Sequence, residues 1–148
     1  MASEPISGRI LALDVGSRTF GMAVSDPLGI FAQPLGAVEV KDTASAADEV
    51  AQIARERGVE RIVVGLPRNM DGSLGPKAEE ARAFGALLAE KTGLPVDEWD
   101  ERLSTMAAER ALRQSDMSRD KRKKRVDMVA AQIILQAYLD AHRRKNAP

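Results

Sequence analysis

One acid in an otherwise apolar stretch constrains this chain more than any other feature. The segment Arg9–Asp26 holds two short apolar runs, Ile10–Leu13 and Met22–Val24, on either side of a Gly-Ser-Arg-Thr turn, and this pattern predicts a β-hairpin. Asp14 falls at the end of the first run, in a stretch that reads as buried. Because an unpaired carboxylate that leaves water costs several kcal/mol, something must compensate for it.

The turn of this hairpin allows a ligand to come close. Gly16 and Gly21 bracket the turn, and Arg18 supplies a fixed cation at its tip. An anionic ligand, a metal ion or both would fit that arrangement.

Length and composition predict one domain in a reducing compartment. The 148 residues suit a single domain, 1–148, and we expect residues 1–7 and 143–148 to be flexible. The absence of cysteine excludes disulfides and thiolate metal sites. No apolar run approaches the ~18 residues of a membrane span, and residues 1–7 lack the pattern of a signal peptide. We therefore expect a cytoplasmic protein without a membrane partner.

The remaining apolar patterns predict an α/β fold, a mixed sheet with helices on its faces. After the hairpin, the expected elements are an edge strand within Ile30–Val40, a helix at Thr43–Arg57, a strand at Arg61–Gly65, a helix from Pro76 to about Lys91, a strand at Val96–Glu101, a helix from Ser104 or Thr105 through Leu112, and a last helix from about Arg122 to Ala141. Ligands of such sheets bind beyond the carboxyl ends of parallel strands. Three features fall at ends of that kind: Asp14, the loop Gly65–Gly75 and Glu101.

Three acids that stand beside apolar residues could carry chemistry. They are Asp14, Glu101 and Asp127, and the apolar positions three, four and seven residues after Asp127 place it against the sheet. Three converging carboxylates need a cation, and oxygen ligands without histidine or cysteine select Mg²⁺ or Mn²⁺. Such an ion polarises a phosphodiester and lowers the pKa of an attacking water. The three acids are therefore candidate metal ligands and catalytic residues of a hydrolase.

Each acid also has a purely structural explanation. Asp14 could cap its own turn, and Asp127 could favour the start of a helix. Glu101 could pair with Arg102 or with an arginine elsewhere. A single metal site accounts for all three acids at once, and we therefore expect it.

Positive charge is concentrated late in the chain. Residues 1–100 carry 10 lysines and arginines against 16 aspartates and glutamates, whereas residues 101–148 carry 12 against 6. Six cations stand within Arg119–Arg125, directly before Asp127. Cations at a helix start oppose the helix dipole, so local stability does not explain them, although a solvated charge run is the alternative. Phosphates of a nucleic acid would explain them, and the candidate contacts are Lys121, Arg122, Lys123, Lys124 and Arg125.

Two arginines outside this basic segment are further candidate contacts for phosphate. Arg18 and Arg68 lie in the two loops nearest the expected site and are candidate phosphate ligands. With one tryptophan, one tyrosine and three phenylalanines, the chain offers no stacking platform for single-stranded bases, so backbone and shape recognition would dominate. The basic segment His142–Lys145 is expected to fray, with His142 beyond the core.

Four motifs, in this order, resemble the YqgF family. They are Asp14-x-Gly16-x-Arg18-Thr19-x-Gly21-x-Ala23-x-Ser25-Asp26, Gly65-Leu66-Pro67 with Asp71-Gly72, Asp100-Glu101-Arg102-x-Ser104-Thr105, and Val126-Asp127-x-x-Ala130-Ala131-x-x-Ile134-Leu135. The resemblance covers nearly the whole chain. Members of this family are described as Holliday-junction-resolvase-like nucleases implicated in maturing the 5′ end of pre-16S ribosomal RNA.

The resemblance implies a ribonuclease-H-like fold, with a five-stranded mixed sheet in the order 3-2-1-4-5 and helices on both faces. It implies that Asp14, Glu101 and Asp127 bind metal in a nuclease that acts on structured nucleic acid. The implied substrate is pre-16S rRNA in pre-ribosomal particles, with branched DNA at a Holliday junction as the alternative. Junction resolvases usually place a second acid one turn along the last helix, where this chain has Ala130. We therefore expect one tightly held ion, with a second recruited by substrate.

Two other classes of protein remain as alternatives. The Asp-x-Gly hairpin also resembles the phosphate-binding turn of the actin and sugar-kinase superfamily, but those enzymes close two such domains over ATP and this chain has the length of one. A non-catalytic RNA-binding or transcription-associated factor could keep the same fold without turnover.

Overall fold

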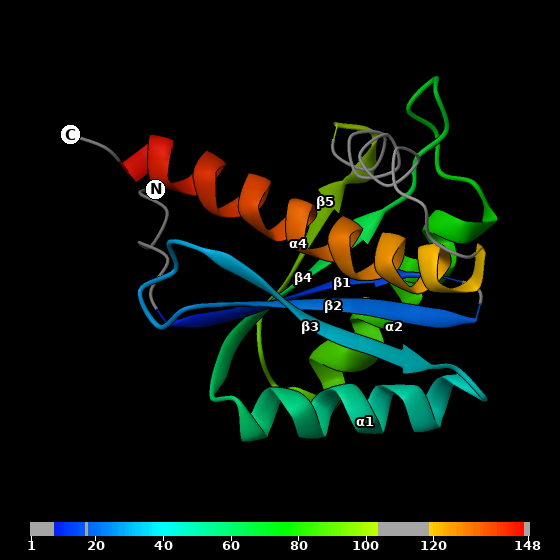
Figure 1. The fold of residues 1–148 in the computed structure, drawn as a ribbon, viewed down its shortest axis with the longest axis horizontal. Coiled ribbons are helices and arrows are strands. Elements are labelled where there is room, and N and C mark those ends of the chain that lie inside the picture. Colours follow the sequence, from blue (N-terminus) through cyan, green and yellow to red (C-terminus); the bar gives the residue numbers. More distant parts are fainter. Residues whose placement is uncertain (1–7, 17, 104–118, 147–148) are drawn as a thin grey trace.

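The computed structural model of the chain describes residues 8–16, 18–103 and 119–146, and within 119–146 it describes side chains from Val129 to His142. Its elements are β1 (Arg9–Val15), β2 (Thr19–Ser25), β3 (Ala32–Glu39), α1 (Thr43–Glu56), β4 (Val59–Leu66), α2 (Pro76–Thr92), β5 (Val96–Asp100), the 3₁₀ turn η1 (Glu101–Leu103) and α4 (Arg119–Asn146). The strands form one five-stranded sheet in the order β3-β2-β1-β4-β5 (Figure 1). This order confirms the expected mixed sheet.

The connections explain the directions of the strands. Short turns join β1 to β2 and β2 to β3, and both pairs are antiparallel. Helix α1 lies between β3 and β4, and helix α2 lies between β4 and β5, so β4 runs parallel to β1 and β5 runs parallel to β4. The carboxyl ends of β1, β4 and β5 therefore share one end of the sheet.

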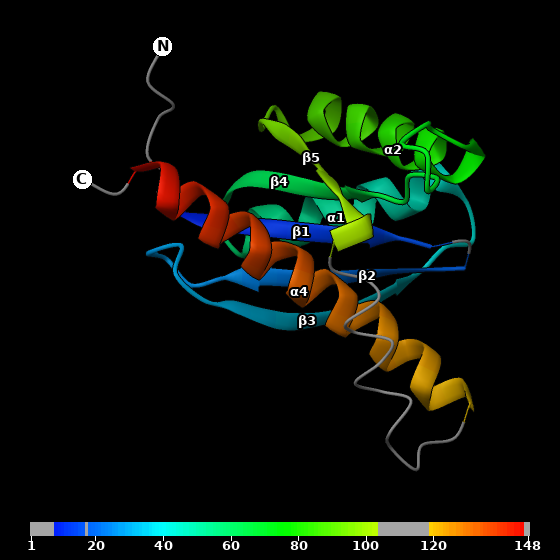
Figure 2. The same cartoon turned by 90° about the horizontal axis from the view of Figure 1, so that it is seen from above.

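Strand alternation divides the core into two layers. On β1, Leu11 and Leu13 pack with α1 and α2, whereas Ile10 and Ala12 pack with α4. Figure 1 shows α1 below the sheet and α4 above it, and Figure 2 shows α4 crossing the strands on its own face. The prediction of helices on both faces is confirmed.

Helices α1 and α2 begin at the residues that their sequence signals indicate, and each ends one residue away from its predicted end. The Asp42 carboxylate accepts the Ser45 N–H at 2.8 Å and caps the first turn of α1. Pro76 occupies the first turn of α2, and Gly93, with a φ of 72°, ends that helix in the left-handed region.

Other boundaries differ from the sequence predictions. Strand β4 extends beyond Arg61–Gly65 at both ends, and β5 stops before Glu101, which begins η1. Helix α4 does not end at Ala141 but continues to Asn146. His142 is partly buried and lies outside the core cluster that α4 forms with the sheet, and its ring contacts that of Tyr138 at 4.0 Å between ring centroids. The helix predicted from Ser104 or Thr105 through Leu112 lies outside the described residues.

Helix α4 is tied to both edges of the sheet. At the β3 edge, Gln136 Oε1 accepts the Ala32 N–H at 2.9 Å, and Gln136 Nε2 donates to the Ile30 carbonyl at 3.0 Å. At the β5 edge, the Tyr138 hydroxyl donates to Asp97, whose carboxylate also accepts from Arg61 Nη1 at 3.0 Å. Burial, followed by the bond to Asp97, raises the pKa of Tyr138. These contacts fix the position of α4 across the strands.

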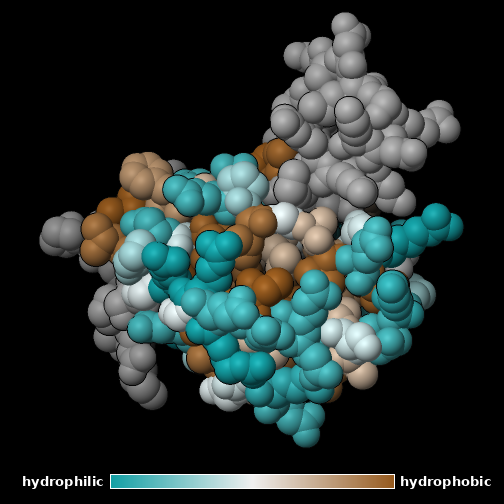
Figure 3. All heavy atoms as spheres, turned by 60° about the horizontal axis from the view of Figure 1, so that its bottom comes forward, coloured by the Kyte–Doolittle hydropathy of each residue, from teal (hydrophilic) through white to brown (hydrophobic). Residues whose placement is uncertain are grey.

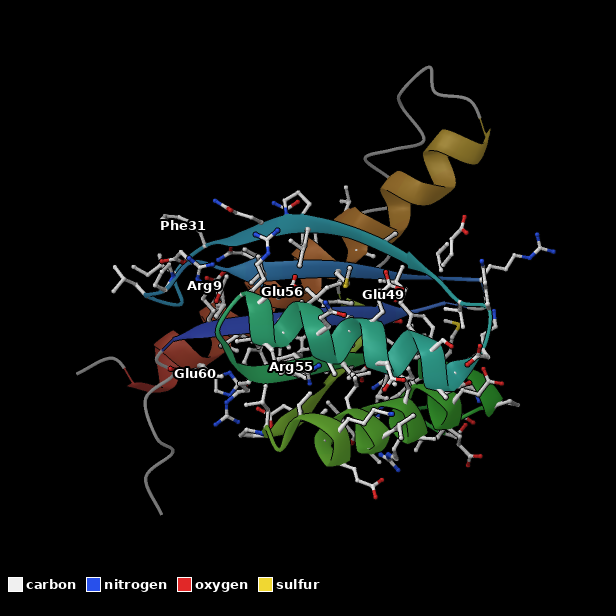
Figure 4. The ribbon with its side chains drawn as sticks, turned by 90° about the horizontal axis from the view of Figure 1, so that it is seen from below. Arg9, Phe31, Glu49, Arg55, Glu56 and Glu60 are labelled. Atoms are coloured by element: carbon white, nitrogen blue, oxygen red, sulfur yellow. The ribbon has the colours of Figure 1, made fainter. Side chains whose placement is uncertain are left out.

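The outer face of the α1 layer is mostly hydrophilic (Figure 3). Glu49, Arg55 and Glu56 lie on α1, while Arg9, Phe31 and Glu60 lie near the end of the sheet where β1 begins (Figure 4).

Among the described helices, none combines the length and the apolar character that crossing a bilayer requires.

We predict that Gln136→Met lowers the free energy of unfolding by about 1–3 kcal/mol, because the Ala32 N–H and the Ile30 carbonyl lose their partners. Urea unfolding at constant pH measures this change. Gln52→Met is the matched control, since among the described contacts the Gln52 side chain bonds only to Glu56 on the exposed face of α1, and we expect a change of less than about 0.5 kcal/mol. Equal effects of the two substitutions would contradict the assigned role of Gln136.

Candidate active site

Asp14 lies between two glycines on the face of the sheet that α4 covers. Because side chains alternate along a strand, Asp14 points to the same face of the sheet as Ala12, and Ala12 packs with α4. In the register of the sheet, Asp14 pairs with Gly21 on β2. On the other side, the last β1–β4 pair is Leu13 with Val64, so Asp14 lies beside Gly65. Because neither neighbour has a side chain, side chains from other elements can approach the half-buried Asp14.

Glu101 occupies the space above Gly65. The side chain is 6% exposed. Its Oε1 lies 2.6 Å from the position that a Cβ on Gly65 would take, and Cδ1 of Ile134 on α4 lies 2.9 Å from the same point. The Glu101 carboxylate therefore lies between the sheet and α4, at the strand position adjacent to Asp14. The structure brings these two acids to the same end and the same face of the sheet.

Asp127 belongs to α4, seven residues before Ile134 and thus about two helical turns away from it. Its side chain lies outside the described part of the chain, so the convergence of the three acids stays a prediction. Among the described side chains, no three acidic or histidine groups gather closely enough to hold a metal ion. The same limit applies to Lys121, Arg122, Lys123, Lys124 and Arg125, whose backbone lies in α4.

Arg102 forms a charged pair with Asp100, directly beside Glu101. Arg102 Nε donates to both oxygens of Asp100, at 3.0 and 2.9 Å. These bonds hold the pKa of Asp100 below its ordinary value and raise the pKa of Arg102. The sequence pattern suggested Arg102 only as a partner of Glu101, and its pair with Asp100 was not predicted, although all three residues are consecutive.

The two candidate arginines in the loops differ in their contacts. Arg18 is exposed, and its carbonyl accepts the Val40 N–H at 2.8 Å, which ties the β1–β2 turn to the end of β3. Arg68 Nη1 donates to the Gly72 carbonyl at 3.1 Å and so braces its own loop. Arg18 therefore presents its guanidinium to solvent, whereas Arg68 has one of its donors occupied.

The chemistry of the donors fits a hard divalent cation. Asp14 and Glu101 offer only oxygen ligands, and the sequence contains no cysteine. Its one histidine, His142, lies near the end of α4 that is far from Asp127. Carboxylate oxygens without nitrogen or sulfur ligands suit Mg²⁺ or Mn²⁺.

The fold is shared with junction resolvases. The solved structure of Thermus thermophilus RuvC in complex with Holliday junction substrate matches with a TM-score of 0.56, at 15% sequence identity, over 93% of this chain and 97% of that one. Together with the sheet order 3-2-1-4-5, this likeness defines a ribonuclease-H-like fold.

Sequence comparison defines the family. The model of the RuvX family, described as Holliday junction resolvase, matches residues 8–141. A Symbiobacterium thermophilum protein named "Putative pre-16S rRNA nuclease" is 53% identical over 133 residues, which cover 90% of this chain and 92% of that one. A Clostridioides difficile protein of the same name is 50% identical over 135 residues, which cover 91% and 96%. The chain belongs to the RuvX family, also called YqgF, as its motifs indicated.

We predict that Gly65→Ala displaces the Glu101 carboxylate, because the new methyl group would stand within 2.6 Å of Oε1. The expected cost is about 1–3 kcal/mol of unfolding free energy, as for other overpacked positions. Emission of Trp99, the one tryptophan of the chain and the register partner of Gly65, is expected to shift.

Gly85→Ala is the control for this prediction. It adds the same methyl group on the opposite face, where the nearest atom is Val96 Cγ1 at 3.3 Å. We expect a change in unfolding free energy of less than about 1 kcal/mol, since a gain in helix propensity offsets the tighter contact. Unchanged Trp99 emission in Gly65→Ala would contradict the placement of Glu101.

Proposed function

We propose that this protein is a metal-dependent endonuclease that hydrolyses phosphodiester bonds in structured RNA and processes the 5′ end of pre-16S rRNA. The observation that carries the proposal is the placement of Asp14 and Glu101 on one face of the sheet, beneath the helix that contains Asp127. The names of the relatives supply the substrate.

In this proposal Asp14, Glu101 and Asp127 hold Mg²⁺ or Mn²⁺. When bound, the ion polarises the phosphodiester and lowers the pKa of the attacking water. Ala130, one turn after Asp127, is fully buried and offers no further ligand. We therefore propose one tightly held ion, with a second recruited by the phosphates of the substrate.

The basic residues of the proposal bring the phosphate backbone to these acids. Arg18 stands exposed at the turn that follows Asp14. The segment Lys121–Arg125 directly precedes Asp127, so phosphates bound there would lie next to the metal ligands. Arg68, braced within its loop, adds positive charge near Asp100.

The family description and the solved neighbour favour a second substrate, the Holliday junction. Ribosomal RNA remains the first candidate, because the two relatives above are about half identical to this chain whereas the resolvase shares only its fold. An enzyme with this substrate would work in the cytoplasm on pre-ribosomal particles. A non-catalytic RNA-binding factor is the outcome if no substrate is cut.

The direct test incubates purified protein with a pre-16S leader fragment and, in parallel, with a four-way DNA junction, in Mn²⁺ or in chelator. We expect metal-dependent cleavage of the leader, and we expect Asp14→Asn to lower its rate by at least about 100-fold, because a metal ligand is lost. Gel electrophoresis of end-labelled substrate measures both rates.

Asp48→Asn is the control for the same chemical change, since Asp48 pairs only with Lys91 among the described contacts and lies on α1, on the other face. Its cleavage rate should equal that of the wild type. Cleavage of the junction alone would favour the resolvase, and binding without cleavage of either substrate would favour the RNA-binding factor.

The basic segment is tested by the salt dependence of binding. We predict that Arg122→Gln with Arg125→Gln weakens RNA binding and reduces the slope of log K against log salt by about 1 for each lost phosphate contact. Fluorescence anisotropy over a range of KCl concentrations gives this slope.

Arg55→Gln with Arg57→Gln removes the same charge from the α1 side of the molecule, where Arg55 is visible in Figure 4. The slope should then stay at the wild-type value. Equal slopes for the two double variants would remove the segment in α4 from the RNA-binding surface.

A further inference from the structure

The loop between β4 and α2 carries an apolar side chain in solvent. Met70 is 98% exposed and is the most exposed of three large apolar side chains that face solvent in the described residues, the others being Leu28 and Phe31. Figure 1 shows this loop standing out beyond the end of β4. A side chain in this position contributes no burial to folding, so packing within the chain does not explain it.

The loop holds Met70 in a preorganised turn. The Asn69 carbonyl accepts the Gly72 N–H at 2.9 Å, and the Asn69 N–H donates to the Ser73 carbonyl at 3.0 Å. Asp71 directs its carboxylate back to Ser73, accepting the N–H at 2.9 Å and the hydroxyl at 2.6 Å, and these bonds lower its pKa. Met70 is therefore the residue that this turn presents outward.

The turn stands at the end of the sheet that carries the acids. Its first residues follow Leu66, and Gly65, one position earlier, lies beneath the Glu101 carboxylate. The Gly72 side of the turn faces Arg102, because a Cβ added to Gly72 would lie 3.6 Å from Arg102 Nη1. A nucleic acid whose backbone reached Glu101 would bring its neighbouring bases toward this loop.

We propose that Met70 is an apolar wedge that enters a base step of the bound nucleic acid next to the bond to be cut. Methionine is among the side chains that unstack base pairs in this way, and its thioether makes favourable contacts with aromatic rings. A step opened by Met70 lets the phosphodiester leave helical geometry and approach Asp14 and Glu101. This inference rests on the proposed function and adds a distortion of the substrate to it.

The experiment uses an RNA stem from the leader fragment, with 2-aminopurine at successive positions, whose fluorescence rises when the base unstacks. Cleavage is measured on this stem and on a second stem with a single-nucleotide bulge at the position that the wild type cuts. The variants are Met70→Gln, which keeps length but adds polarity, and Met70→Leu, which stays apolar. Leu28→Gln is the control, since Leu28 is 74% exposed in the β2–β3 turn, at the opposite end of the sheet.

We expect Met70→Gln to cut the fully paired stem at least about tenfold more slowly and the bulged stem within about twofold of the wild-type rate, because the bulge supplies the opened step. Its fluorescence rise should be lost, while Met70→Leu and Leu28→Gln keep it. Unfolding midpoints should not change, since the altered side chains are in solvent.

Three results would overturn the wedge. The first is a wild type without a fluorescence rise, and the second is a Met70→Gln variant that keeps the rise. The third is an equal loss of cleavage on both stems in Met70→Gln, which would assign Met70 to general binding or to a protein partner. If the wild type cuts neither stem but its fluorescence rise depends on Met70, the proposed nuclease function fails and the wedge stands.

Discussion

Glu101 is buried beneath α4, and Asp14 stands at the neighbouring strand position on the same face of the sheet. Two negative charges placed there are costly without a compensating positive charge, and the arrangement of the site follows from this cost. The central strand supplies Asp14, and the turn after the edge strand supplies Glu101. Glycine at positions 21 and 65 removes the side chains that would otherwise fill the space around them. A divalent cation between the carboxylates would offset the repulsion, and this is the physical basis of the proposed function.

The helix above this face must be held in place for a metal site to form. Gln136 ties α4 to the β3 edge, and Tyr138 ties it to β5 through Asp97. These contacts lie on the carboxyl-terminal side of the fully buried Ala130 and Ala131, whereas Asp127 and the basic segment lie on the other side. One part of α4 therefore anchors the helix, and in the proposed function the other part carries the residues that meet the metal ion and the substrate.

The sequence predicted those elements whose ends carry their own signals. Asp42 and Pro76 mark helix starts, and an acid that ends an apolar run marked Asp14 as unusual. The strand order came from the family resemblance, because strand patterns alone do not specify neighbours. The end of α4 was misjudged, because its apolar stripe stops near Ala141 whereas the backbone stays helical to Asn146. The contact of Glu101 with Gly65 joins residues distant in sequence, and no local pattern contains it.

The proposed function requires that Asp14, Glu101 and Asp127 share one cation. Titration of Mn²⁺ into the wild type and into Asp14→Asn, Glu101→Gln and Asp127→Asn, followed by electron paramagnetic resonance, tests it without any nucleic acid. We expect one tight site in the wild type and its loss in each of the three variants. Wild-type affinity in Asp127→Asn, or in either of the other two, would contradict the claim.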